Sequence, residues 1–204
     1  MIAMRFLAVL CCALLAGCAT TVDKQFASLE QARPCCASIR EFKFEPLPAK
    51  GSKFKLDERA SVFDFDSGRS YFKAFELPGS GLRRYRVKTY FNGMWIGQYL
   101  DPVLLILDAE HREVARGALS LRFDDGNLFG DQNAHLFGFF AVDDEARYLV
   151  VLTAPFESEA PVAQTDPSVM VTRIGQTPIA SPTPGASIRL HRSPTGTVRV
   201  EPLP

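Results

Sequence analysis

The amino-acid sequence predicts an all-β fold: an antiparallel, two-sheet, jelly-roll-like β-sandwich with one short helix near its N-terminus. Apolar and polar residues alternate in many short segments, and these segments end at turn residues such as Gly, Pro, Asp and Asn. No helical pattern long enough for a parallel crossover separates them. The run Val103–Leu107 is wholly apolar and too short for a helix, which predicts a strand that its neighbours cover on both faces. Polar and small turn residues follow the run, which predicts that this strand enters a hairpin.

The composition is that of one ordinary globular domain. The chain has 204 residues, of which 47% are apolar and 23% are charged. Lys plus Arg and Asp plus Glu number 23 each, and loss of a leader that contains only Arg5 leaves 22 against 23, a net charge of −1. Such a balance gives no electrostatic reason to expect nucleic acid as a partner.

Residues 1–17 have the pattern of a signal peptide. Arg5 supplies the positive start, Phe6–Leu15 is an unbroken apolar run too short to span a bilayer, and Leu15-Ala16-Gly17-Cys18 closes it. This ending resembles a bacterial lipobox, which predicts that Cys18 becomes the lipidated first residue of the mature protein. A plain signal peptide with a cysteine at the cut is the alternative. Ala19, in place of an Asp, favours the periplasmic side of the outer membrane.

Residues 18–40 are expected to form a lipidated tether that contains a short helix and a cysteine pair. A weak amphipathic pattern over Asp23–Arg33 predicts the helix, which Pro34 ends. Cys35 and Cys36 are adjacent, and an oxidising periplasm favours their pairing. Adjacent Cα atoms lie closer together than most disulfides allow, so a vicinal disulfide and two separate thiols both stay open.

Residues 41–204 are predicted to form the sandwich. Leu82–Tyr90 alternates most cleanly and places the basic side chains of Arg84, Arg86 and Lys88 together on a solvated face. A proline-rich segment, 154–185, interrupts the pattern, and Val169–Ile174 within it is a candidate edge strand. The chain is expected to end with a hairpin that pairs 188–191 with 197–200.

No pattern in the sequence indicates an enzyme, a cofactor site or a metal site. The three histidines lack the short spacing of a zinc site, and there is no nucleophile motif or phosphate-binding glycine loop. Oxygen-bearing side chains crowd one loop, but their spacing fits no known calcium loop: Asp124, Asp125, Asn127, Asp131 and Asn133. They are therefore interpreted as turn residues.

One loop after the basic strand is the candidate ligand platform. It combines aromatic rings with amide side chains: Tyr90, Asn92, Trp95, Gln98 and Tyr99. Aromatic faces beside amides are typical of sugar binding, whereas aromatic side chains that fold back over the core are the alternative. If the aromatic side chains belong to the core or to an interface, docking of a protein partner is favoured over sugar binding.

Several segments together resemble the maltose-operon periplasmic protein family over roughly residues 35 to 200. They are Cys35–Ile39, Phe63–Phe65, Gly68–Pro78, Val103–Asp108 and Tyr148–Thr153. The resemblance implies a non-catalytic, exported β protein that is accessory to carbohydrate transport, of the maltose or maltodextrin type. A structural or protein-docking outer-membrane lipoprotein with no sugar ligand is the alternative.

Overall fold

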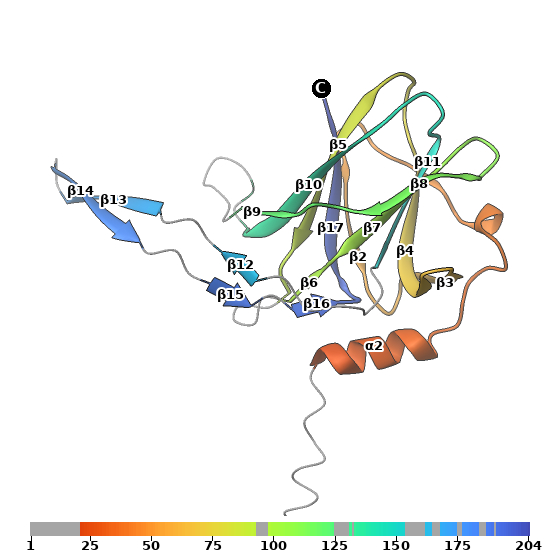
Figure 1. Ribbon diagram of the computed structural model, residues 1–204, viewed down its shortest axis with the longest axis horizontal. Helices are drawn as coiled ribbons and strands as arrows, with labels where there is room; N and C mark the ends of the chain where they lie inside the picture. The colour runs from red at the N-terminus through yellow and green to blue at the C-terminus, as the bar shows by residue number, and fades with distance from the viewer. Residues whose placement is uncertain are drawn as a thin grey trace, which may run out of the picture.

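The computed structural model shows an all-β sandwich of two sheets, as the sequence predicts (Figure 1). It describes residues 21–92, 98–124, 131, 133–153, 162–164, 168–174, 177–183, 187–189 and 191–204. No helix among these residues is long and apolar enough to cross a membrane.

The two sheets are named here after one strand of each, β7 and β5. The β7 sheet has six strands: β1 (Glu45–Pro46), β3 (Ser61–Phe65), β4 (Gly68–Glu76), β11 (Tyr148–Thr153), β7 (Pro102–Leu107) and β8 (Glu113–Ala118). The β5 sheet has five, in the order β2 (Ser52–Leu56), β17 (Gly196–Leu203), β5 (Arg83–Tyr90), β10 (His135–Val142) and β9 (Arg122–Asp124). All pairs in both sheets are antiparallel except the short β1–β4 pair.

The sandwich interior is built by side chains that alternate inward along strands of both sheets. Val87 of β5 and Val198 and Val200 of β17 meet Tyr71 and Phe75 of β4 in one buried cluster. The residues between them on β5 and β17 point outward, as a strand with one buried face requires. Local alternation in the sequence thus decides which side chains enter the core.

Strand β7 is buried on both faces, which explains its unbroken apolar run. Its inner side chains join the sandwich interior, while Leu105 and Leu107 face outward into a second cluster. Segment 35–46 covers that outer face, where Phe42 stacks on Phe72 with ring centroids 4.1 Å apart. Burial of the strand is confirmed, but this irregular segment, and not only neighbouring strands, provides the cover.

The predicted N-terminal helix is confirmed as α2 (Thr21–Gln31), which lies across one end of the sandwich (Figure 1). Leu29 enters the core, and Gln25 Oε1 accepts a hydrogen bond from Ser193 Oγ at 2.7 Å. Arg69 donates to the Ala32 carbonyl at 3.1 Å just beyond the helix. Together with the short 3₁₀ helix η1 (Ile39–Glu41), this region packs on the domain, so residues 21–40 are not a free tether.

The predicted C-terminal hairpin is wrong. Strand β16 (His191–Ser193) pairs in parallel with β6 (Gln98–Leu100), whereas β17 lies between β2 and β5. Because both edges of β17 are occupied, it has no edge left for β16. The predicted strand at 169–174 is confirmed as β13 (Ser168–Ile174), paired with β14 (Thr177–Thr183); β12 (Val162–Gln164) pairs with β15 (Ser187–Arg189).

Candidate functional site

The predicted ligand platform is not formed by its two tyrosines, because both are buried. Tyr99 is 1% exposed and Tyr90 is 6% exposed. Burial raises the pKa of the Tyr99 phenol, which is consistent with a core position. Their ring faces are therefore not open to a sugar. Trp95 lies outside the described residues.

The two amide residues of the predicted platform close the base of the loop. The backbone N–H of Asn92 donates to the Gln98 carbonyl at 2.7 Å, and Asn92 Nδ2 donates to the Thr195 carbonyl at 2.8 Å. The Asn92 side chain is thus already engaged by the chain itself. Its role in the described structure is to hold the loop against the turn before β17.

Tyr90 also belongs to a larger feature, the outer face of the β5 sheet. Residues directly opposite one another in antiparallel strands point to the same side, so the register defines rows across this face. One row crosses all five strands and has four basic members: Lys53, Arg199, Lys88, Phe137 and Arg122. The neighbouring row is Lys55, Thr197, Tyr90, His135 and Asp124. The alternation in the sequence predicted the outward side chains of β5 only. It did not predict the rows that cross all five strands.

A paired cluster of charges occupies the middle of the outer face. Lys88, 7% exposed, lies with its Nζ 3.2 Å from Asp131 Oδ2 and 4.0 Å from Glu201 Oε2. Arg86 and Arg199 each contact Glu201 at 2.7 Å. Burying a charge is costly unless it is paired, and these two carboxylates supply the pairing. The predicted solvated stripe is therefore corrected: Arg84 is exposed, Arg86 is half-buried and Lys88 is buried.

Asp131 and Tyr90 are coupled by a short hydrogen bond from the tyrosine hydroxyl. Burial opposes ionisation of Asp131, but the hydrogen bonds from Tyr90 and Lys88 outweigh it and lower the Asp131 pKa to about 2. Burial, followed by the bond to Asp131, raises the pKa of Tyr90. Lys53 Nζ lies 4.0 Å from the centre of the Tyr90 ring, a cation–π contact. At neutral pH the Asp131 carboxylate is therefore ionised, whereas the Tyr90 hydroxyl keeps its proton.

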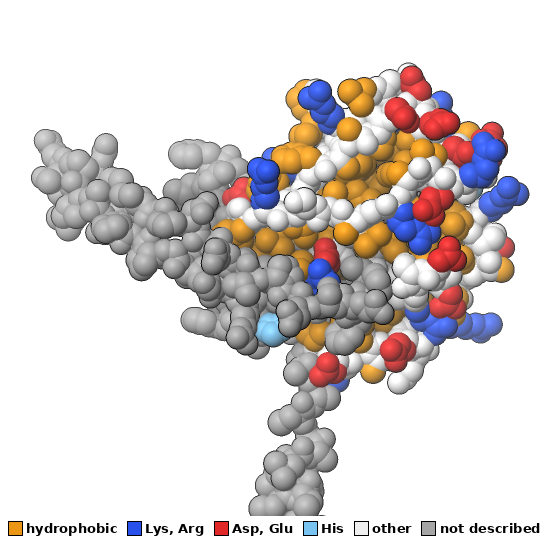
Figure 2. Space-filling view, in the orientation of Figure 1, with side chains coloured by type: hydrophobic (Ala, Val, Ile, Leu, Met, Phe, Trp, Pro, Cys, Tyr) orange, Lys and Arg blue, Asp and Glu red, His pale blue; other side chains and the backbone are white. Residues whose placement is uncertain are grey.

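The outer face combines excess positive charge with aromatic rings. Among the described residues, the outward side chains of the five strands, together with the Asp131 that pairs with Lys88, carry seven basic groups against three acidic ones. This is a balance of +4 in a chain whose total is zero: Lys53, Lys55, Arg84, Arg86, Lys88, Arg122 and Arg199 against Asp124, Asp131 and Glu201. Phe137 and Phe139 form an edge-to-face pair, and Phe139 is 56% exposed. Figure 2 shows basic side chains among hydrophobic ones over β9 and β10, whereas charges of both signs mix along its right-hand rim.

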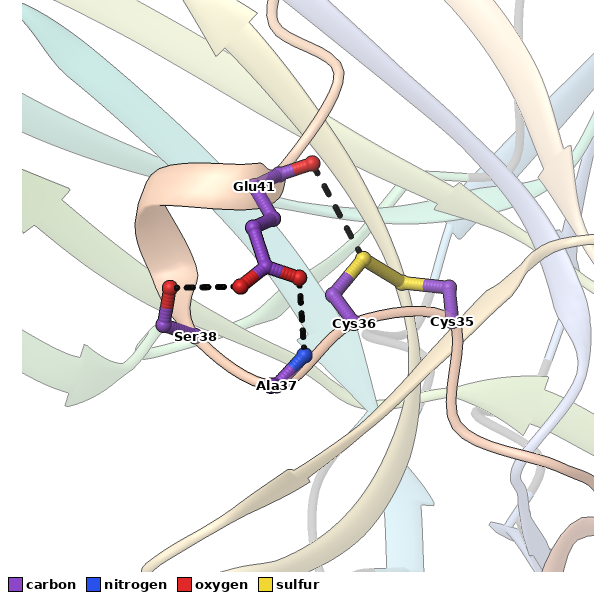
Figure 3. The surroundings of a disulfide bond; sticks show 5 residues. All are labelled: Cys35, Cys36, Ala37, Ser38 and Glu41. Atoms are coloured by element: carbon purple, nitrogen blue, oxygen red, sulfur yellow. Dashed lines mark hydrogen bonds between the residues drawn. A yellow bond between two sulfur atoms is a disulfide. The ribbon is translucent and has the colours of Figure 1, made fainter.

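Cys35 and Cys36 form a vicinal disulfide, which is one of the two states left open by the sequence (Figure 3). Hydrogen bonds hold the chain on both sides of the disulfide. The Cys35 N–H donates to the Val62 carbonyl at 2.8 Å. The Glu41 carboxylate accepts from the Ala37 N–H at 3.0 Å and from Ser38 Oγ at 3.2 Å. Cys36 packs against the outer cluster of the β7 sheet. The disulfide thus lies at the start of the segment that covers β7.

A separate hollow of about 310 Å³ opens beside β2, β3 and β4, and its lining includes Phe54, Asp57, Arg59 and Lys73. The hydrogen bond from the Arg59 guanidinium to Asp57, at 3.0 Å, is the main reason that the Asp57 pKa falls to about 2. No histidine or cysteine lines the hollow. Across the described residues, no group of three or more potential metal ligands is present.

The fold and the outer face define a two-sheet β-sandwich protein with a basic, partly aromatic surface. No protein-family model, curated protein or solved structure matches this chain.

Proposed function

We propose that this protein is a non-catalytic lipoprotein of the bacterial cell envelope, anchored in the periplasmic leaflet of the outer membrane and accessory to carbohydrate uptake. The observation that carries the anchor is the Leu15-Ala16-Gly17-Cys18 ending of an apolar leader. Each buried methylene of an acyl chain contributes about 0.8 kcal/mol, so two or more chains on Cys18 hold the protein at the membrane stably.

The packing of α2 fits a short anchor. Only Ala19 and Thr20 separate Cys18 from Thr21, where α2 begins. Three residue steps reach at most about 11 Å. Because α2 is held to the sandwich by Leu29 and Gln25, a lipid on Cys18 would keep the α2 end of the domain close to the bilayer surface.

The outer face of the β5 sheet is the surface proposed to bind carbohydrate. The exposed ring of Phe139 can stack on the apolar face of a sugar, and the neighbouring arginines can donate hydrogen bonds to its hydroxyl groups. The resemblance of the sequence to the maltose-operon periplasmic protein family supports carbohydrate uptake as the process. This face replaces the Tyr90–Tyr99 loop as the proposed location.

Docking of an envelope protein is the second candidate function. Burial of Tyr90 and Tyr99 and the use of the Asn92 amide by the chain itself favour it, because these groups are then structural. In this alternative the outer face contacts a protein and no sugar binds.

Two experiments test the proposal. Cells that express the full chain or its Cys18→Ser variant are labelled with a fatty-acid probe; the wild type is expected to carry the label and the variant to lose it. An unlabelled wild type whose variant still fractionates with membranes would contradict the anchor.

For carbohydrate binding, the detergent-solubilised protein is titrated by calorimetry with a panel of oligosaccharides, neutral and acidic. Phe139→Ala is expected to weaken binding about fivefold or more, because the lost contact with one aromatic ring is worth about 1 kcal/mol. Val114→Ala, which trims an exposed apolar side chain on β8 of the other sheet, is the matched control and should bind normally. Absence of binding by every sugar at millimolar concentration would favour protein docking.

A further inference from the structure

We propose that the outer face of the β5 sheet selects acidic oligosaccharides, those that carry uronate carboxylates, over neutral ones. This inference rests on the proposed function, since it specifies the class of carbohydrate that the same face binds. The binding line is the row of Lys53, Arg199, Lys88, Phe137 and Arg122. It crosses the sheet from edge to edge.

The dimensions of this row suit an extended oligosaccharide. Neighbouring strands lie about 4.8 Å apart, so five strands place the two ends of the row roughly 19 Å from each other. A pyranose unit is similar in length to one strand spacing. A chain of roughly four sugars laid across the strands would therefore reach from Lys53 on β2 to Arg122 on β9.

The described charges along the row form no ion pair at its two ends and are neutralised by carboxylates at its centre. Lys88 and Arg199 are paired with Asp131 and Glu201. Among the described residues, no carboxylate forms an ion pair with Lys53 or Arg122, and both side chains are exposed. The carboxylates of an acidic ligand could therefore form ion pairs with these two cations, and they would gain the most binding free energy at these two ends.

Beside its central member, Lys88, the row offers an aromatic ring instead of an unpaired charge. Phe137 lies between Lys88 and Arg122 in the row, and its partner Phe139 is exposed in the next row. A sugar ring presents an apolar face that stacks on such a side chain. The face therefore matches a ligand with alternating carboxylates and apolar ring faces, which is the chemistry of a polyuronate.

The orientation of the face argues against an anionic membrane as its ligand. β5 ends and β17 begins near the end of the sandwich that α2 covers, so the strands run away from that end (Figure 1). With Cys18 three residues before Thr21, the bilayer lies beyond α2. The outer face then stands side-on to the membrane and is open to soluble glycans.

The test compares a hexamer of galacturonic acid with uncharged maltohexaose on the detergent-solubilised full chain, by calorimetry at low ionic strength and at about 0.15 M salt. The acidic hexamer is expected to bind about tenfold more tightly at low salt and to lose much of this advantage at the higher salt. The double variant Lys53→Gln with Arg122→Gln is expected to weaken uronate binding about three- to tenfold. It should leave maltohexaose binding nearly unchanged.

The matched control is Arg40→Gln with Lys43→Gln. These exposed cations lie on segment 35–46, which covers the outer side of the β7 sheet, away from the β5 sheet. The control removes two positive charges, as the Lys53→Gln and Arg122→Gln variant does. Normal uronate binding by the control and weakened binding by the face variant support the proposal.

Four outcomes overturn the proposal. Equal affinity for the two hexamers refutes acidic selectivity and leaves the proposed carbohydrate function standing, whereas failure to bind any sugar refutes both. Uronate binding that both double variants weaken equally shows that net charge, and not this face, is responsible. Stronger binding to vesicles of phosphatidylglycerol, lost in the face variant, would assign the face to a membrane.

Discussion

Removing the Asp131 carboxylate is predicted to destabilise the fold in a pH-dependent way. Asp131→Asn leaves the Lys88 ammonium, which is 7% exposed, without its nearest acid, and the next carboxylate oxygen is that of Glu201 at 4.0 Å. An isolated buried charge costs several kcal/mol. Because Glu201 remains nearby, the expected loss of unfolding free energy at pH 7 is about 1–3 kcal/mol.

The pH dependence follows from the lowered pKa of Asp131. The pKa falls from 3.8 in the unfolded chain to about 2 in the folded protein, which corresponds to at most about 2.4 kcal/mol of stability above pH 4. The Asp131 side chain is 15% exposed, and solvent screening reduces this contribution to stability to roughly 1–2 kcal/mol. Since the folded pKa is the lower one, this stability is complete above about pH 4 and disappears as the pH falls toward 2.

Urea unfolding of the wild type and of Asp131→Asn at several values between pH 2 and pH 7 measures both effects. The difference in unfolding free energy between them should be largest at neutral pH and should shrink below pH 4. Asp66→Asn, which removes an exposed carboxylate, is the control and should follow the wild type. Parallel loss of stability in wild type and Asp131→Asn down to pH 2 would refute the pairing of Asp131 with Lys88 and Tyr90.

Three further experiments test the packing and the disulfide. Leu105→Ala should lower the unfolding free energy by about 2–5 kcal/mol, because Leu105 is fully buried in the outer cluster; a change within 0.5 kcal/mol would contradict that burial. Gly196→Ala would place a Cβ atom 2.5 Å from Leu100 Cβ and should cost roughly 1–3 kcal/mol by urea unfolding, whereas Gly117→Ala meets no atom within 4 Å and should be neutral. Thiol alkylation of the unreduced, unfolded protein should label neither Cys35 nor Cys36, and labelling of both would contradict the disulfide.

The features that the sequence predicted correctly are those with a local cause. The apolar run of β7 and the polar turn that follows it form a strand and a hairpin to β8, with Asp108 and Arg112 closing the turn. The alternation of Leu82–Tyr90 assigns Tyr85, Val87 and Thr89 to the buried side of β5. Each of these patterns depends on neighbours along the chain, so the residues themselves carry the information.

Other features depend on segments that only the folded chain brings together. The strand at Thr197–Val200 was predictable as a strand, but its position between β2 and β5 follows from contacts with residues more than a hundred positions away. Likewise, the alternation of β5 places Lys88 on the outer face, yet its burial depends on Asp131, which lies 43 residues later. Periodicity determines which way a side chain points, whereas its burial and its partners depend on long-range pairing, which no local pattern encodes.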